Sequence, residues 1–430
     1  MLDSKKLMKN PFSSTEWAWM LYDLTTNSYA TIILAAIFPI YFNVMVGHSA
    51  LGLELKGFGS SFVMLVTAIL CPILGALGDR KRMKKRFWAS FAFSGAILTL
   101  GLAFVSSWPL LLLGYILSNI CYNTAMLFYD SFITDITIPE RMHRVSTWAY
   151  AIGYFGGGTI TLIITTILLF AMGTSNPLPV KISFALSALW WIVFSLPMLF
   201  RVKQVHYHEK TFKETTDGLL KQLGKTFREI WMDKGLRHFV LAYFFYIDGV
   251  ATVITMATSY GQTLGLSASL MILALLTTQL VAVPFSILFG KLAGKFDAIK
   301  MILFAIGAYI VICLLGFYMG NMVETAHGAA RTVAIGHAQV IFWIVAILVG
   351  TVQGGIQALS RSQFGQMIPS ERSNEYFGFF NIFNRFASIL GPLLMALTTM
   401  LTGLTSFGIL SVVILFIAGA ILLLTGRKYF

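Results

Sequence analysis

Charged residues are scarce in this chain: only 11% of its 430 residues are Asp, Glu, Lys or Arg, whereas 57% are hydrophobic. A chain with so few polar side chains cannot cover the water-exposed surface of a protein of this length, and this excludes a soluble globular fold. Cysteine is also rare, and Cys71, Cys121 and Cys313 lie inside apolar runs without paired spacing, so we expect no disulfide. No phosphate-binding glycine loop occurs, which excludes ATP as the energy source.

Long apolar runs fill the sequence instead. A helix needs about 20 mostly apolar residues to cross about 30 Å of hydrocarbon. The runs are continuous rather than alternating, which favours helices over a barrel, and the first run is too long for a cleaved signal peptide. We predict an all-α membrane protein with twelve transmembrane helices near residues 17–46, 57–78, 86–107, 109–134, 145–172, 180–200, 237–261, 268–291, 300–320, 334–360, 374–402 and 405–425. Ser13 and Glu16 have the spacing of a capping box that opens the first helix.

The formal net charge of +13 is a topology signal. The basic residues gather in alternate loops, between predicted helices 2 and 3, 4 and 5, 8 and 9, and 10 and 11. The positive-inside rule therefore places both termini in the cytoplasm of a multi-pass protein, which we expect in the inner membrane of a bacterium. This placement excludes nucleic acid as a partner and leaves a weak contact with anionic lipids.

One long polar stretch divides the predicted helices six from six. The predicted domains are an N-terminal six-helix bundle at 1–200, a linker at 201–236, and a C-terminal bundle at 237–430. Apolar residues recur at helical spacing beside basic ones between 219 and 231, which favours a helix lying on the cytoplasmic face over a mobile linker. His206 and His208 form an isolated pair in this stretch, interpreted as solvated rather than metal-binding.

The loop from Gly75 to Arg86 carries a recognisable signature, a Gly followed after three residues by Asp79, Arg80 and a basic cluster. It resembles the loop signature of the major facilitator superfamily, whose two six-helix halves are parallel repeats. We predict a cytoplasmic gate in which Gly75 allows close helix approach, Asp79 faces the N-terminal end of a helix in the other bundle, and arginines pair with acids such as Asp135. The gate set is Gly75, Asp79, Arg80, Asp135 and Arg144. The glycine of the family signature is replaced by Arg82, and the matching loop of the second half, from Gly290 to Asp297, lacks the acid.

Three further stretches carry a narrower resemblance. They are Trp17 to Phe42, Tyr122 to Ile136, and Gln353 to Ser362 with the following segment from Phe377 to Pro392. Together they resemble the autophagy-related protein 22-like family, the vacuolar effluxer branch of the superfamily. This resemblance spans nearly the whole chain and implies a substrate class of neutral amino acids, leucine and tyrosine among them.

Four charges fall clearly inside predicted spans: Asp23, Asp130, Asp248 and Arg385. A charge near the middle of the membrane costs about 2.5–3.5 kcal/mol on insertion scales, so its presence suggests a function. Asp248 and Arg385, the deeper pair, are interpreted as lining a central cavity. Asp23 and Asp130 have two open interpretations, a cavity role or pairing with basic residues across the bundle interface. The predicted substrate or coupling residues are Asp23, Asn27, Asn123, Asp130, Tyr246, Asp248, Gln353, Gln357, Asn381 and Arg385.

These features predict a secondary transporter, not an enzyme, that works by alternating access without a cofactor or a metal ion. The expected substrate is a small zwitterion such as a neutral amino acid, the coupling ion is a proton if a buried carboxylate can take one up, and the protein is expected to be monomeric among membrane lipids. Two alternatives stay open: an exporter of larger amphipathic compounds, and a membrane receptor that retains a transporter fold without moving solute.

Overall fold

The computed structural model of the protein is helical throughout the part it describes, which comprises residues 11–47, 50–173, 176–209 and 218–430. The side chains at 50–54, 268–269, 272 and 384–388 lie outside this description. The first half contains α2 (Ser14–Met20), α3 (Tyr22–Tyr29), η1 (Ala30–Ala36), α4 (Ile37–Met45), α5 (Ala50–Gly78), α6 (Met83–Leu102), α7 (Trp108–Ser131), α8 (Ile133–Ile136), α9 (Pro139–Ile152), η2 (Gly153–Thr159), α10 (Ile160–Met172) and α11 (Leu178–Arg201). The rest contains α13 (Leu219–Met232), α14 (Lys234–Thr263), α15 (Ala268–Phe296), α16 (Ala298–Glu324), α17 (Ala329–Met367), η3 (Ser370–Arg372), α18 (Ser373–Thr402), α19 (Thr405–Ser411), α20 (Val413–Gly426) and η4 (Arg427–Tyr429).

Ten helical stretches of the described residues are long and apolar enough to cross a membrane. They coincide with ten of the twelve predicted spans. The other two predicted spans, 86–107 and 374–402, fall on the helices α6 and α18. The basic first turn of α6 lowers its hydropathy, and α18 is interrupted by the side chains at 384–388 that lie outside the description, so crossing of the membrane by these two helices stays a prediction.

The first helix begins as its sequence indicates. Ser13 accepts a hydrogen bond from the Glu16 N–H at 3.1 Å, and the Glu16 carboxylate accepts one from the Ser13 N–H at 2.7 Å, which confirms the capping box. The same carboxylate also receives the Arg141 guanidinium of α9 at 2.8 and 2.9 Å. A single buried acid thus starts one helix and ties it to another.

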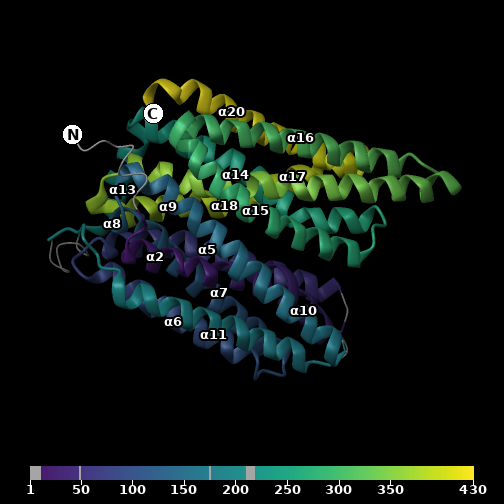
Figure 1. Cartoon of the computed structure of the whole chain (residues 1–430), viewed down its shortest axis with the longest axis horizontal. Coiled ribbons are helices and arrows are strands. Elements are labelled where there is room, and N and C mark those ends of the chain that lie inside the picture. The colour runs from purple at the N-terminus through teal and green to yellow at the C-terminus, as the bar shows by residue number, and fades with distance from the viewer. Residues whose placement is uncertain (1–10, 48–49, 174–175, 210–217) are drawn as a thin grey trace. The chain divides into compact units, whose positions relative to one another are not determined.

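The helices pack as two compact units. The first comprises residues 1–228 together with 365–382, and the second comprises 229–364 with 383–430. In the first unit α6 packs against both α7 and α11 (Figure 1). In the second, α20 packs against α14 and α16. The end of α17 and the start of α18 therefore belong with the N-terminal half, although the rest of both helices belongs to the second unit.

Two loops at matching places in the halves share an unusual backbone conformation. Arg82, between α5 and α6, has φ of 66°, and Asp297, between α15 and α16, has φ of 77°. Each lies seven positions after the glycine that begins its loop signature, Gly75 or Gly290. A positive φ is disfavoured for residues with a Cβ atom. Glycine adopts this conformation without strain, and the superfamily signature that this loop resembles has a glycine at the position of Arg82.

Replacing Arg82 with glycine should stabilise the protein. Relief of the left-handed conformation is worth about 1 kcal/mol, and the side chain of Arg82 is exposed. We expect Arg82→Gly to raise the midpoint of thermal unfolding in detergent. Arg82→Ala is the matched control, since it removes the same charge but keeps the strain. Equal midpoints for the two variants would contradict the explanation.

Candidate functional site

The first turn of α18 is held by an acid from another helix. Asp79, directly after α5, is 1% exposed. One of its carboxylate oxygens accepts hydrogen bonds from the backbone N–H of Asn374 at 2.9 Å and from its side-chain amide at 2.8 Å. The other oxygen accepts the backbone N–H of Glu375 at 2.9 Å. Because the first N–H groups of a helix have no partner within the helix, the carboxylate acts as its N-terminal cap.

The pKa of the Asp79 carboxyl group is subject to opposing effects. Burial raises the pKa of its carboxyl group to about 7, while the Lys84 ammonium and the two backbone N–H groups act in the opposite direction. The ionised form is the better acceptor for the α18 N–H groups. The strength of this cap is therefore sensitive to protonation near neutral pH.

Gly75 allows α18 to come this close. A Cβ atom at Gly75 would overlap the carbonyl group of Asn374 and would lie 3.2 Å from the Cα of Glu375. The neighbouring Gly78 is restricted by the ring of Phe128, which would lie 2.6 Å from its Cβ. Any side chain at Gly75 would therefore push the first turn of α18 away from Asp79.

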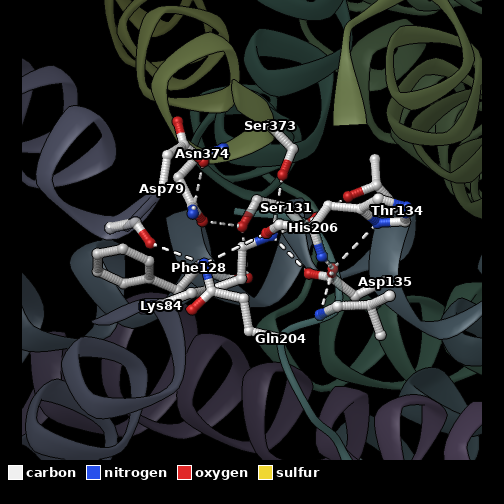
Figure 2. A network of polar contacts seen from close by, with 12 residues as sticks. Asp79, Lys84, Phe128, Ser131, Thr134, Asp135, Gln204, His206, Ser373 and Asn374 are labelled. Carbon is white, nitrogen blue, oxygen red and sulfur yellow. Dashed lines mark hydrogen bonds and ion pairs between the residues drawn. The ribbon is translucent and has the colours of Figure 1, made fainter. Parts of the chain in front are cut away.

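A buried ion pair lies beside this cap. The Lys84 ammonium is 2.7 Å from the Asp135 carboxylate, and both side chains are fully buried. Lys84 also donates to the Ser373 hydroxyl of α18 at 2.9 Å and to the Ser131 carbonyl at 3.3 Å. Figure 2 shows these groups turned toward one another. We expected arginines of the loop to pair with Asp135, and the structure shows Lys84 as a partner of this carboxylate.

The second oxygen of Asp135 holds the segment that follows α11. It accepts the backbone N–H groups of Val205 at 2.9 Å and His206 at 2.8 Å, and it lies 3.2 Å from Nδ1 of His206 (Figure 2). This hydrogen bond raises the pKa of His206 above its usual 6.5. His206, whose side chain is 36% exposed, is therefore in contact with solvent and also belongs to the same network.

The remaining gate residues lie at the edge of this network. Arg80 is half-buried and forms an isolated parallel β-bridge with His208. The backbone N–H of His208 donates to the Asp79 carbonyl at 2.7 Å. The Arg144 guanidinium lies over the ring of Phe12 at 4.3 Å. The structure thus brings Gly75, Asp79 and Asp135 together around the start of α18 and places Arg144 against the N-terminal segment.

Glu375 was not predicted, and it connects this site to α13. Its buried carboxylate accepts hydrogen bonds from Thr226 at 2.5 Å and Gln222 at 2.9 Å, both on α13, and from Arg372 at 3.3 Å. The sequence signal was the polar segment that begins α18, which interrupts an otherwise apolar span. We call the set Asp79, Lys84, Asp135, Ser373, Asn374 and Glu375 the docking cluster.

The predicted substrate residues of the first unit are buried or partly buried. Asp23 accepts a hydrogen bond from Thr26 at 2.9 Å, and Asn27 donates to the Asp23 carbonyl at 3.1 Å, so Asp23 and Asn27 form one polar turn of α3. On α7, Asn123 donates to the Asn119 side chain at 2.8 Å. Asp130 lies two turns further along α7 and is half-buried.

In the second unit, Asp248 of α14 reaches α18 at its proline. Asp248 is fully buried. Its two carboxylate oxygens accept the Gly391 N–H at 3.0 and 3.1 Å, and one of them also accepts a hydrogen bond from the Thr252 hydroxyl at 3.4 Å. Pro392 has no N–H, and a Cβ at Gly391 would overlap Thr252. Asp248 therefore binds the helix where its own hydrogen-bond ladder is weakest.

The other predicted residues are spread over both units. Tyr246 bonds the Ser360 hydroxyl at 2.6 Å. Gln353 is buried on α17, and Gln357 donates to its carbonyl at 3.1 Å. Asn381, in the first unit, donates to the Phe377 carbonyl at 3.1 Å. Arg385 lies on α18, and its side chain is outside the described residues.

No group of three or more metal-ligating side chains gathers among the residues that the structure describes. The site consists instead of carboxylates, amides and hydroxyls that contact helix ends. These contacts hold the first turn of α18 against the end of α5.

The fold matches that of solved transporters. The xylose:proton symporter XylE superposes with a TM-score of 0.71 at 14% identity, covering 96% of this chain and 95% of the other. A bacterial homologue of the iron transporter ferroportin matches with a TM-score of 0.69 at 15% identity over 96% and 99%. The fold is therefore the one that XylE, a protein of the major facilitator superfamily, also has.

Sequence comparison narrows this class. The model of the family described as "Vacuole effluxer Atg22 like" matches residues 57–140 and 134–426. The chain is 38% identical to the MFS-type transporter YxiO of Bacillus subtilis (strain 168), over 97% of this chain and 95% of that protein. Autophagy-related protein 22 of Yarrowia lipolytica is 24% identical over 59% of this chain and 45% of its own length. The chain belongs to the Atg22-like family, as its motifs predicted.

Loss of Lys84 should destabilise the protein strongly. Lys84→Met would leave the Asp135 carboxylate buried without its cation, a change that costs on the order of 3–5 kcal/mol. Because two backbone N–H groups still reach Asp135, we expect the lower end of this range. Thermal unfolding in detergent measures the effect.

The double variant Lys84→Met/Asp135→Asn is the control, and it should recover part of the loss because no uncompensated charge remains. A double variant as unstable as the sum of both single variants would argue against a buried pair.

His206 should make stability depend on pH. Its folded-state pKa is raised by Asp135, so its contribution is fully present below the unfolded value of 6.5 and is lost as pH rises through the folded value. The side chain is 36% exposed, which limits the effect to below about 1 kcal/mol. The unfolding midpoint of wild type should exceed that of His206→Gln at pH 6 and approach it at pH 8. A difference that is constant between these pH values would exclude a protonated His206.

Proposed function

We propose that the protein moves a small organic solute, a neutral amino acid or a similar zwitterion, across the bacterial cytoplasmic membrane by alternating access. It acts as a monomer and needs no cofactor. Membership of a family of effluxers and the fold shared with solute transporters support a transport role. In such folds the substrate site lies near the bilayer midplane and two bundles move about it.

The observation that carries the proposal is the way α18 is held. Its first turn is docked on Asp79 in the first unit, and the same helix binds Asp248 at Gly391 in the second unit. A helix fixed at both places cannot move relative to either without breaking charge-assisted hydrogen bonds. Release of the docking cluster is therefore the step that opens the cytoplasmic side.

Proton coupling follows from the chemistry of Asp248. Its described partners are the Gly391 N–H and the Thr252 hydroxyl, both of which donate to the carboxylate. A proton taken up by Asp248 would weaken its hold on Gly391, so protonation and the position of α18 are linked. Asp130, half-buried on α7, is the second candidate for the coupling site.

The polar residues of the predicted substrate set suit a zwitterion. Amides at Asn27, Asn123 and Gln357, together with the carboxylates, offer both donors and acceptors for an amino and a carboxylate group. The surrounding helices are apolar enough to accept a hydrocarbon side chain. Leucine and tyrosine are therefore the first substrates to examine.

Transport in proteoliposomes tests the proposal. We expect wild type to exchange radiolabelled leucine or tyrosine in counterflow, and to accumulate it when a pH gradient is imposed. Asp248→Asn should retain counterflow but lose gradient-driven accumulation, because exchange does not need a change of protonation state. The exposed Glu140→Gln is the control and should behave as wild type.

Two outcomes would contradict separate parts of the proposed function, the substrate class and the proton coupling. Absence of counterflow for both amino acids, with binding of another solute, would remove the substrate class. Unchanged dependence on the pH gradient in Asp248→Asn and in Asp130→Asn would remove both acids from a protonation role.

A further inference from the structure

The helix α13 presents three distinct faces. In an α-helix, successive residues are about 100° apart around the axis. On this spacing Gln222, Thr226 and Ile230 share one face, Leu220, Phe227 and Trp231 share a second, and Lys221, Lys225 and Arg228 share a third. The apolar and basic faces adjoin each other. This is the pattern of a helix that lies in the interface between water and lipid.

The first face is turned into the protein. Thr226 and Ile230 are buried. Thr226 and Gln222 donate to the Glu375 carboxylate at 2.5 and 2.9 Å, and Arg372 donates to Thr226. Glu375 therefore connects α13 to the first turn of α18 through hydrogen bonds.

The other two faces are exposed. Leu220 is 82% exposed, Phe227 47% and Trp231 46%, which is unusual for large apolar side chains on a water-facing helix. Lys221, Lys225 and Arg228 are exposed beside them. A partner for this surface must offer hydrocarbon and negative charge in adjoining layers. An anionic phospholipid leaflet has this chemistry, with acyl chains below a plane of charged headgroups.

We propose that α13 binds anionic lipid headgroups at the membrane surface, and that this binding tightens the docking cluster through Glu375. The connection is short. The backbone N–H of Glu375 donates to Asp79, while its carboxylate receives α13. Lipid that holds α13 in place therefore holds the first turn of α18 on Asp79. The effect on transport rests on the proposed gate, whereas binding and tightening do not require transport.

Membrane contact is measured with nitroxide labels on α13. In a variant with the three native cysteines replaced, labels at Leu220→Cys and Met232→Cys report the apolar and basic faces. In nanodiscs of phosphatidylcholine with one third phosphatidylglycerol, the label at 220 should be accessible to oxygen and shielded from a water-soluble nickel chelate. The label at 232 should show the reverse. Two labels equally accessible to nickel would overturn the lipid contact.

Coupling is measured by hydrogen exchange of the Asn374 and Glu375 amides, the donors to Asp79. Exchange should be several-fold slower in the phosphatidylglycerol nanodiscs than in phosphatidylcholine alone. Lys221→Gln/Lys225→Gln/Arg228→Gln should abolish the difference. Arg427→Gln/Lys428→Gln, which removes two exposed basic residues elsewhere, should keep it.

The variant Gln222→Leu/Thr226→Val separates binding from coupling. It should retain the lipid contact at position 220 but lose the slower exchange, because its link to Glu375 is cut. Equal exchange of the wild-type amides in both lipids, or a difference that survives the triple neutralisation, would overturn the proposal. Since no substrate is used, neither result depends on whether amino acids are transported.

Discussion

The N–H groups at the start of a helix have no partner within that helix, and hydrocarbon offers no water to replace one. Among the described residues, acids from elsewhere in the chain meet this need at the starts of α18 and α19, and a third acid, Asp248, receives an N–H group in the interior of α18. Asp79 receives the first turn of α18, Asp248 receives Gly391 next to the proline of the same helix, and Glu324 at the end of α16 accepts the N–H groups of Thr405 and Ser406 at 2.8 and 3.2 Å. Acidic residues number only 18, and several of them are placed where a helix would otherwise begin unsatisfied.

This arrangement gives α18 a special position among the helices. Its own hydrogen-bond ladder is interrupted at Pro392, and its first turn depends on Asp79, the residue that follows α5. Both attachments are charge-assisted and therefore directional, so they hold the helix at defined points rather than along a broad apolar surface. Apolar packing resists sliding only weakly within lipid, since lipid tails are as apolar as the helices. The polar attachments therefore decide where α18 is held.

Much of this could be predicted from sequence, because it depends on local spacing. Hydropathy located ten of the twelve predicted spans, and the interval from Ser13 to Glu16 located the first cap. The partner of Asp135 could not be predicted, because Lys84 stands in a run of basic residues that look alike along the chain. Only its face on α6 buries it, whereas Arg82 and Lys81 stay exposed. Glu375 was missed for a related reason, since its partners Gln222 and Thr226 lie about 150 residues away in sequence, beyond the reach of periodicity.

The two halves show how backbone geometry and chemistry can diverge within a repeat. Arg82 and Asp297 share a positive φ at the same offset from Gly75 and Gly290, so the loop conformation is common to both. The chemistry is not. The first loop has Asp79 at the fourth position after its glycine and uses it to cap a distant helix, whereas the second has Gly294 there. Its acid, Asp297, accepts the N–H of Ile299 at 3.3 Å and caps the helix that follows directly. Because the second loop has Gly294 where the first has Asp79, the loop of the second half offers no counterpart to the Asp79 cap among the described residues.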